Sequence, residues 1–394
     1  MRNVYPLRSV FQSITLGLLV VLLPACGVLT PRVTPPETTS NVPVDNTAPT
    51  QAPVPAPSAT TPPAASDDEI RISAVGDIML DGTAHPVLQE NGYDYPFVHM
   101  RPVFKDSQVV IGNLEGPLTT RGTAEEGKTY TFRSPPDKVS AALKQAGFGV
   151  VTLANNHTLD YGPEGLAQTL EALDAVGIQH VGAGEDLAAA RRAAIVTVNG
   201  QRLAFLGYSV TLPETFYAGA HTAGTAFGHE AQVRDDVIAA RQQADIVIVS
   251  FHWGQEGKTE LRDYQTHLGH VAIDAGAQAV LGHHPHILQA IEYYKGGVIL
   301  YSLGNFTFGS YSKTAATSAV AQLSFRHGRL AALRMVPILV NNFEVQFQPR
   351  VLTGTDADAV VSNLQRLSAL QHTTLVNLAG EAHLQLPATT ARAE

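Results

Sequence analysis

Five short apolar runs, each ending in polar side chains, most constrain what this 394-residue chain can fold into. They cover residues 70–77, 109–115, 149–157, 245–254 and 277–286 and are rich in β-branched residues. Amphipathic segments at residues 138–147, 165–177, 229–243 and 264–276 separate several of these runs. Because strands that alternate with helices usually pair in parallel, the pattern predicts an α/β fold.

Hairpin signals add antiparallel strands to this core. Asn199-Gly200 joins two strand-like runs, Lys295-Gly296-Gly297 joins two more, and residues 319–325 and 329–335 form a third pair. The sheet is therefore expected to be mixed, and there could be two sheets. A helix near residues 356–370 is expected to precede a weak tail.

The N-terminus has the features of an export signal. Arg2 and Arg8 precede the apolar run Ile14–Leu23, which is too short to cross a bilayer of about 30 Å at about 1.5 Å per residue. The single cysteine of the chain, Cys26, follows Pro24-Ala25 and resembles the lipidated cysteine of a bacterial lipoprotein. An ordinary signal peptide with a chance cysteine is the alternative.

A change in composition marks a linker after this signal. Ten of the 24 prolines lie between Pro31 and Pro63, among Thr, Ala and Ser, a composition that cannot pack a core. We therefore expect residues 1–25 to be a lipoprotein signal peptide and 26–69 a disordered tether that begins at the lipidated cysteine. Residues 70–340 would form the folded domain, and 341–394 a C-terminal helix with a weakly ordered tail. A Pro-rich partner-binding segment is the alternative for the tether.

Charge and cysteine content exclude two classes of protein. The formal net charge is −9, from 26 Lys and Arg against 35 Asp and Glu. An acidic surface argues against binding to a phosphate backbone, so nucleic acid is not expected as a partner. With one cysteine, no disulfide can form within the chain.

The residues that could carry chemistry stand where the predicted strands end. In open α/β sheets, ligands bind beyond the carboxyl ends of the strands. Those ends carry carboxylates, amides and imidazoles: Asp77, Asn113, Glu115, Asn155, Asn156, His157, Asp160, His252, His283, His284 and His286. This mixture suits Zn, Mn or Fe, and two such ions bridged by a carboxylate such as Glu115 would clamp a phosphoryl group.

Each of these residues also has a structural explanation when taken alone. Asp77 could cap a helix, and His252 could be a buried histidine with satisfied hydrogen bonds. His284-Pro285-His286 is more specific, because residues two apart in an extended chain point to the same side, which would turn His283 away. The occurrence of all five clusters at strand ends favours a metal site.

Six motifs together resemble the CapA family, a poly-γ-glutamate capsule-synthesis group that is similar to the calcineurin-like metallophosphoesterases. In chain order they are Gly76–Met79, Gly112–Pro117, Leu153–His157, His252–Gly254, Gly282–His286 and Tyr301–Phe306. The resemblance runs from about residue 70 to residue 337. It implies a four-layer α/β/β/α sandwich of mixed sheets, metallophosphoesterase-like, with two divalent ions (Mn, Fe or Zn) held between its loops.

The family pattern also implies roles for single residues. Asp77 and Glu115 would be acidic ligands, with Glu115 bridging, while Asn156, His252 and His284 would bind one ion and His286 the other. His157 would lie beside the phosphoryl group as an acid or charge stabiliser, oriented by Asp160. Met79 replaces a histidine usual in metallophosphoesterases, so one ion would be weakly held, or completed by water or Asp81.

Three functions stay open at this point. The first is a metal-dependent, phosphoesterase-like hydrolase involved in poly-γ-glutamate capsule biosynthesis. The second is a non-catalytic accessory or scaffold for polymer synthesis or export, with a vestigial or polymer-binding metal site. The third is a structural envelope protein. The protein would be exported and lipid-anchored at the outer face of the cytoplasmic membrane, or in the periplasm or outer membrane. Its partners would be the membrane, polymer-synthesis membrane proteins and poly-γ-glutamate.

Overall fold

A computed structural model describes residues 69–387 of the chain. The predicted signal peptide, Cys26 and the tether as far as residue 68 lie outside these residues. Within residues 69–387, no helix is both long enough and apolar enough to span a membrane.

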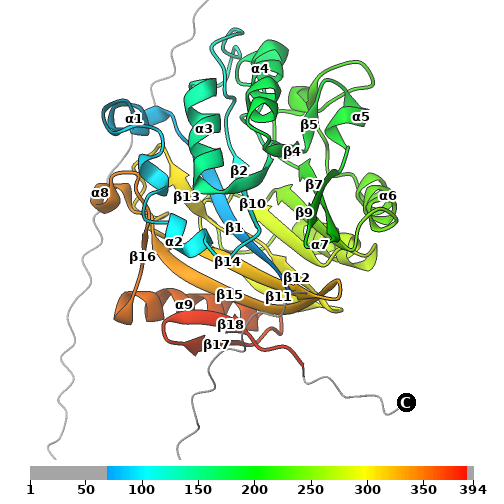
Figure 1. Ribbon diagram of the computed structural model, residues 1–394, viewed down its shortest axis with the longest axis vertical. Helices are drawn as coiled ribbons and strands as arrows, with labels where there is room; N and C mark the ends of the chain where they lie inside the picture. The colour runs from blue at the N-terminus through cyan, green and yellow to red at the C-terminus, as the bar shows by residue number, and fades with distance from the viewer. Residues whose placement is uncertain (1–68, 388–394) are drawn as a thin grey trace, which may run out of the picture. The chain divides into compact units, whose positions relative to one another are not determined.

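Two mixed β-sheets form the centre of the described chain (Figure 1). The ten-stranded sheet has the order β17 (Leu375–Leu378), β18 (Glu381–Leu384), β15 (Arg329–Leu339), β14 (Thr317–Arg326), β1 (Glu69–Met79), β2 (Val109–Leu114), β3 (Phe148–Thr152) and β4 (Gln179–Val181). Two further strands join it, β13 (Asn305–Phe308) beside β1 and β16 (Arg350–Val351) beside β15. The six-stranded sheet has the order β11 (Ile291–Tyr294), β12 (Gly297–Leu300), β10 (Ala279–His283), β9 (Ile246–His252), β7 (Gln201–Ser209) and β6 (Ala194–Val198).

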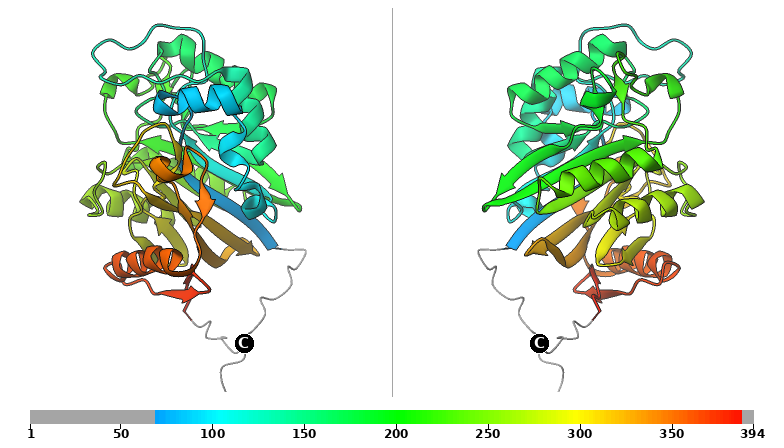
Figure 2. Two further views of the ribbon diagram at one scale, coloured as in Figure 1. Left: turned by 90° about the vertical axis from the view of Figure 1, so that its left-hand side faces the viewer. Right: turned by 90° about the vertical axis from the view of Figure 1, so that its right-hand side faces the viewer.

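Helices cover the outer faces of both sheets (Figure 2). The longer ones are α1 (His85–Asn91), α3 (Pro136–Ala146), α4 (Gly162–Ala175), α6 (Glu230–Arg241) and α7 (Asp263–Asp274). A further helix, α9 (Gly354–Ala369), instead contributes Val360, Val361 and Leu364 to the core between the sheets. Three single-turn helices are α2 (Arg101–Phe104), α5 (Leu187–Ala190) and α8 (Asn342–Val345), and a two-stranded ribbon pairs β5 (Ala183–Gly184) with β8 (Gly224–Thr225).

Successive side chains along a strand alternate between the core that lies between the two sheets and a core under the outer helices. In β9, Ile246 and Ile248 face the core between the sheets, to which Ile72 of β1 also belongs. The intervening Val247 and Val249 face the opposite way and pack under α6 and α7. This period of two is what a strand buried on both faces requires. On the far side of the ten-stranded sheet, a third core packs under α1, α3 and α4. The predicted α/β/β/α sandwich of mixed sheets is therefore confirmed.

The direction of the strands places their carboxyl ends together. Strands β1, β2, β3 and β4 run parallel, as do β7, β9, β10 and β12. All five apolar runs that the sequence predicts as strands are found here, as β1, β2, β3, β9 and β10. The four amphipathic segments are helices α3, α4, α6 and α7, and the three predicted hairpins are β6–β7, β11–β12 and β14–β15.

The C-terminal segment is more ordered than the sequence suggests. Residues 341–394 were expected to hold a helix and a weak tail; the helix is α9, but residues 375–384 form the hairpin β17–β18, which extends the ten-stranded sheet from β15. Two hydroxyls of this region also cap the outer edge of β11, because Ser368 Oγ accepts from Ile291 N at 3.0 Å and Thr373 Oγ1 accepts from Tyr293 N at 2.8 Å. As far as residue 387, this segment belongs to the folded domain.

Candidate metal centre

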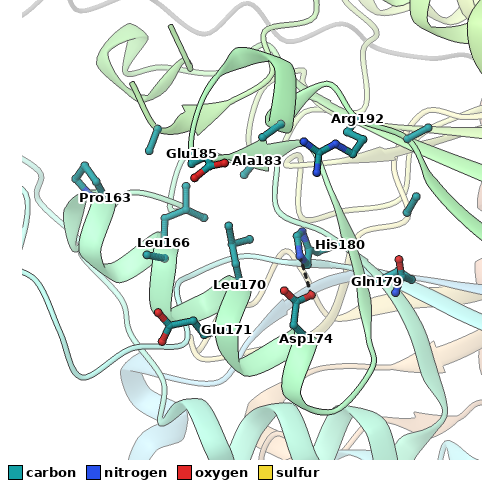
Figure 3. Close-up of a pocket in the computed structure, with 16 residues that line it drawn as sticks. Pro163, Leu166, Leu170, Glu171, Asp174, Gln179, His180, Ala183, Glu185 and Arg192 are labelled. Atoms are coloured by element: carbon teal, nitrogen blue, oxygen red, sulfur yellow. Dashed lines mark hydrogen bonds and ion pairs between the residues drawn. The ribbon is translucent and has the colours of Figure 1, made fainter. Parts of the chain in front are cut away.

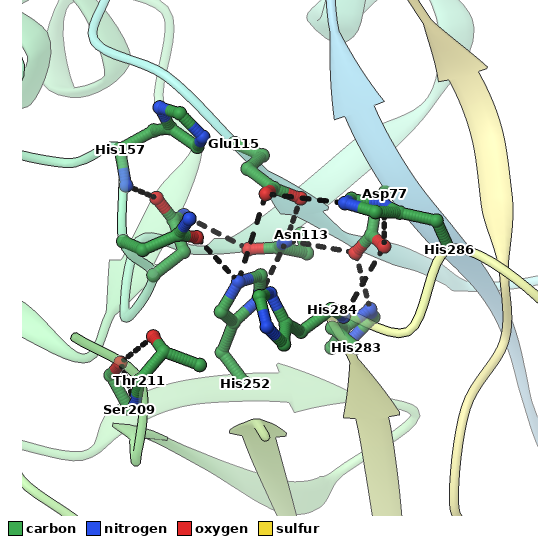
Figure 4. Close-up of polar contacts among 12 residues, drawn as sticks. Asp77, Asn113, Glu115, His157, Ser209, Thr211, His252, His283, His284 and His286 are labelled. Carbon is green, nitrogen blue, oxygen red and sulfur yellow. Dashed lines mark hydrogen bonds and ion pairs between the residues drawn. The ribbon is translucent and has the colours of Figure 1, made fainter. Parts of the chain in front are cut away.

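Loops at the carboxyl ends of both sheets bring polar side chains into one buried cluster (Figure 4). Asp77 lies near the end of β1, Glu115 directly follows β2, Asn156 follows β3 and His252 ends β9. Asp77, Glu115 and His252 are each at most 1% exposed. The strand ends that the sequence singles out therefore meet in one place.

Two overlapping groups of donors in this cluster could each hold a cation. The ligand atoms of Asp77, Glu115 and His252 lie within 4.8 Å of one another, and so do those of Glu115, His284 and His286. Glu115 belongs to both groups, which is the position that a bridging carboxylate needs. The sequence predicts that His252 and His284 bind the same ion, whereas the structure places them in different groups of donors. The ring centroids of these two histidines nevertheless lie only 4.7 Å apart.

Asn156 completes the set of six predicted ligands. Its Oδ1 lies 2.8 Å from His252 Nε2, and the same imidazole nitrogen lies 3.7 Å from Glu115 Oε1. One cation could therefore contact the amide, the imidazole and the carboxylate together.

The chemistry of the donors fits divalent cations. Glu115 Oε1 and His284 Nδ1 are buried and have no hydrogen-bond partner among the described residues. Leaving such an atom unpaired costs about 1–3 kcal/mol, and a bound cation would remove that cost. Carboxylate oxygens with imidazole nitrogens are ligands that Zn, Mn and Fe accept.

Two asparagines position the carboxylates. Asn113 Nδ2 donates to Asp77 Oδ1 at 2.9 Å and lies 3.2 Å from Glu115 Oε2. Asn155 Nδ2 in turn donates to Asn113 Oδ1 at 3.0 Å, and all these side chains are buried. The sequence places both asparagines at strand ends but assigns them no role; the structure shows that they orient the proposed ligands, as partners of metal-binding carboxylates commonly do.

A second polar group lies beside the cluster. His157 Nδ1 is 2.8 Å from Asp160 Oδ2, as the resemblance implies, and Phe132 N donates to the same oxygen at 2.8 Å. Lys128 forms an ion pair with Asp160 Oδ1, donates to Asn156 O at 2.5 Å and lies 3.2 Å from His157 Nδ1. Sequence reasoning missed Lys128, because it stands in a long loop without any periodic pattern.

His283 does not face away from the cluster, as its spacing in an extended chain suggests. It pairs in register with His252 on the neighbouring parallel strand, so both side chains point to the same face of the sheet. Its Nδ1 lies 3.3 Å from Asp77 Oδ1. The alternation of side chains between the two faces of a strand stops at His283, where β10 ends. The residues that follow are not extended, since φ is 95° at His284 and 61° at His286.

Met79 and Asp81 do not complete the site. Met79 is buried, and its thioether lies beside Gly82 and Gly309. Asp81 Oδ2 accepts from Arg133 N at 2.8 Å, and its Oδ1 lies 3.6 Å from His85 Nδ1. The carboxylate of Asp81 is therefore engaged elsewhere, which leaves the Asp77 side of the cluster without the extra ligand.

Burial and close charges shift the pKa values of the cluster in opposite directions. Burial raises the pKa of Glu115 well above its usual range; the charge of His286 opposes this and that of Asp77 adds to it. Burial acts in the same direction on Asp77, but contacts with His283 and His286 outweigh it and hold the Asp77 pKa well below its usual value. Burial lowers the pKa of His286, yet the carboxylates of Glu115 and Asp77 overcome it and raise that pKa to about 9. Burial and the charge of His286 lower the pKa of His284 to about 3. Without cations, the cluster therefore retains protons that cations would displace.

A cavity of about 520 Å³ opens over the cluster and gives access to it. His157, His286, Phe132, Phe308 and Glu256 are among the residues that line it. A separate hollow of about 650 Å³ lies between α4, β4 and α5 (Figure 3). It contains none of the proposed ligands, whereas the cavity over the cluster is lined by His286 and could admit a substrate to the metal centre.

Comparisons with known proteins place the chain in a family. It is 34% identical over 282 residues to the capsule biosynthesis protein CapA of Bacillus anthracis, which covers 69% of this chain and 68% of that protein. It is also 34% identical over 274 residues to the PGA biosynthesis protein CapA of Bacillus subtilis, covering 69% and 72%. A probable polyglutamine synthesis accessory protein of Mycobacterium tuberculosis is 33% identical over 281 residues, covering 66% and 73%.

Solved structures with a similar chain trace are more distant. NAD nucleotidase of Haemophilus influenzae has a TM-score of 0.43 at 14% identity, covering 76% of this chain and 62% of that one. The 5'-nucleotidase precursor of Thermus thermophilus has a TM-score of 0.44 at 14% identity, covering 70% and 55%. Residues 71–310, more than half of the chain, match the family described as bacterial capsule synthesis protein PGA_cap, so the chain belongs to the PGA_cap family.

Proposed function

We propose that this protein is a lipid-anchored, metal-dependent phosphoesterase-like enzyme that takes part in poly-γ-glutamate capsule biosynthesis. Family membership and the names of its relatives in Bacillus support the capsule role. The observation that carries the enzymatic part is the position of Glu115, whose carboxylate is shared by two groups of buried donors. Such an arrangement suits two cations a few Å apart.

The chain would hold these cations with Asp77, Glu115, Asn156, His252, His284 and His286. Divalent ions bound there would supply positive charge to a phosphoryl oxygen in the cavity. His157 lines that cavity and turns Nδ1 to Asp160, so Nε2 is the nitrogen left to contact the substrate. Lys128 and the N–H of Phe132 hold Asp160 in place, which fixes the orientation of the imidazole.

We also propose that Cys26 carries the lipid anchor and that the protein acts outside the cytoplasm. The support is the sequence alone: the basic start, the short apolar run and the single cysteine after Ala25. Metabolic labelling with a palmitate analogue in the host should mark the wild type and leave Cys26→Ala unmarked. Equal labelling of both would contradict this assignment.

The first test of the enzymatic proposal is metal content and turnover. We expect elemental analysis of the purified protein, reconstituted with Mn²⁺ or Zn²⁺, to give about two ions per chain. We expect such protein to hydrolyse a chromogenic phosphomonoester or phosphodiester, and His252→Ala/His284→Ala to lose both ions and activity. His267→Ala, which removes an exposed histidine of α7, is the matched control and should change neither. Two bound ions without turnover of any phosphoester would contradict the hydrolase.

One observation favours a second function. Because Met79 is packed against glycines and Asp81 is engaged elsewhere, the Asp77 side of the cluster offers few ligands to an ion. An ion with open positions could bind carboxylates of the polymer instead of a phosphoryl group. In that case the double histidine variant would lose capsule in the host, although the wild type shows no turnover.

A further inference from the structure

A polar groove lies at the opposite end of the strands from the metal centre. It has a volume of about 830 Å³. It is lined by residues of the β6–β7 turn, of the segment between the end of α6 and β9, and of the β14–β15 turn, among them Arg202, Arg241, Asp245, His327 and Arg329. Asp245 immediately precedes β9, and His252 ends the same strand in the metal centre. At about 3.3 Å per residue, the groove and the metal centre are therefore about 20 Å apart.

The groove concentrates positive charge on an acidic protein. Three arginines and one histidine line it, against a single carboxylate. Arg202, His327 and Arg329 are exposed, and within residues 69–387 no carboxylate comes within ion-pair distance of any of the three. The chain as a whole carries −9. Unpaired arginines that gather from separate segments favour an anionic ligand.

The walls of the groove are held in place by the backbone. Arg241 Nη1 donates to Ala244 O at 3.1 Å and to Asp245 O at 2.6 Å, and these two hydrogen bonds fix one edge of its guanidinium. The single carboxylate is also occupied, because Asp245 Oδ2 accepts from Arg202 N at 2.8 Å. Gly328, with φ of +68°, lets the β14–β15 turn approach residue 245 so closely that a Cβ there would lie 2.9 Å from Asp245 O. The two turns and the end of α6 thus form one preorganised surface.

We propose that this groove binds the carboxylates of a poly-γ-glutamate chain, as a polymer site separate from the metal centre. The choice of poly-γ-glutamate as the polyanion rests on the proposed function; the anionic character of the ligand rests on the groove itself. Arginine suits this ligand because its planar guanidinium can donate two parallel hydrogen bonds to one carboxylate. Arg202 lies near the start of β7 and Arg329 begins β15, so the two arginines come from different sheets and could contact different carboxylates of one chain. This site resolves the repulsion between an acidic domain and an acidic polymer.

The test measures binding of fluorescein-labelled poly-γ-glutamate to the full chain by fluorescence anisotropy, at low salt and with EDTA present. We expect Arg202→Glu/Arg329→Glu to weaken binding at least tenfold. The control Lys138→Glu/Lys144→Glu makes the same change of charge on exposed positions of α3 and should stay within twofold of the wild type. Arg329→Gln, a milder change at an exposed turn, should weaken binding severalfold and keeps the test valid if the double variant unfolds.

Three results would overturn the proposal. One is unchanged polymer binding by a folded groove variant. Another is an equal loss in the α3 control, which would indicate a general charge effect. The third is a groove variant that loses binding to phosphatidylglycerol vesicles and keeps its binding to the polymer. That result would indicate that the groove contacts a membrane. Glu115→Gln tests the groove independently of the proposed enzymatic activity, because it changes the metal centre only. If the polymer binds at the groove, this variant should bind it as tightly as the wild type in EDTA, whether or not the metal centre turns over a substrate.

Discussion

The pH dependence of metal binding gives the sharpest quantitative test of the metal centre. His286 has a pKa raised to about 9 in the metal-free protein by Glu115 and Asp77, so at pH 7 about 99% of it carries a proton. A cation must displace that proton before the imidazole can become a ligand. From pH 7 to pH 9 the fraction of deprotonated His286 rises by more than tenfold, which corresponds to about 2 kcal/mol of binding free energy.

We therefore expect the affinity for Mn²⁺ to increase about tenfold per pH unit near pH 7 and to flatten towards pH 9. Competition with a chromogenic chelator measures the affinity, and calorimetry in buffers of different ionisation enthalpy counts the protons released. His286→Gln should bind Mn²⁺ more weakly, and the proton that it releases on binding should then come from Glu115, whose pKa is raised by burial. His284, with a pKa lowered to about 3, is already neutral, so His284→Gln should weaken binding and keep the full slope. An affinity of the wild type that does not change between pH 6 and pH 8, with no proton released in calorimetry, would refute the reasoning.

Three further predictions concern single positions. Glu115→Gln should release both cations, because its carboxylate belongs to both donor groups; retention of one ion by elemental analysis would contradict the bridging position. Lys128→Met should lower the free energy of unfolding by about 3 kcal/mol, because it leaves the buried carboxylate of Asp160 without the lysine ammonium that pairs with it. Chemical denaturation should show that Lys128→Met/Asp160→Asn recovers most of this loss. Gly282→Ala should prevent folding, because its Cβ would lie 1.9 Å from a backbone oxygen, whereas Gly149→Ala meets only an ordinary contact at 3.5 Å and should give soluble protein with native circular dichroism.

The parts of the fold that the sequence predicts are those in which local pattern and burial agree. The strands β9 and β10 begin as continuous apolar runs because both of their faces are buried, and such runs are easy to recognise. The hairpin β17–β18 was missed, since its four-residue strands include exposed and polar positions. It is stabilised by pairing with β15, a contact that no local pattern encodes.

The same distinction applies to the metal centre. Residues that end a strand, such as Asp77 and His252, could be found because the direction of parallel strands brings their ends together. The orientation of His283 was wrong in the sequence interpretation because it depends on register with a neighbouring strand, and not on spacing along its own. Lys128 reaches Asp160 across 32 residues of sequence, so only the folded loop reveals it.

The antiparallel neighbour of β1 has a practical consequence for how this family is divided into fragments. The family match ends at residue 310, yet β14 begins at Thr317 and pairs with β1 along residues 69–74. A fragment that ends at residue 310 would keep every proposed metal ligand and still leave residues 69–74 of β1 without their antiparallel partner, as an open edge. Open edges of this kind recruit strands from other chains, so such a fragment would aggregate despite having a complete metal site. The family match ends at residue 310, whereas the last paired strand of the sheet, β18, ends at Leu384. The folded domain of this chain therefore extends about 75 residues beyond the part that the family match covers.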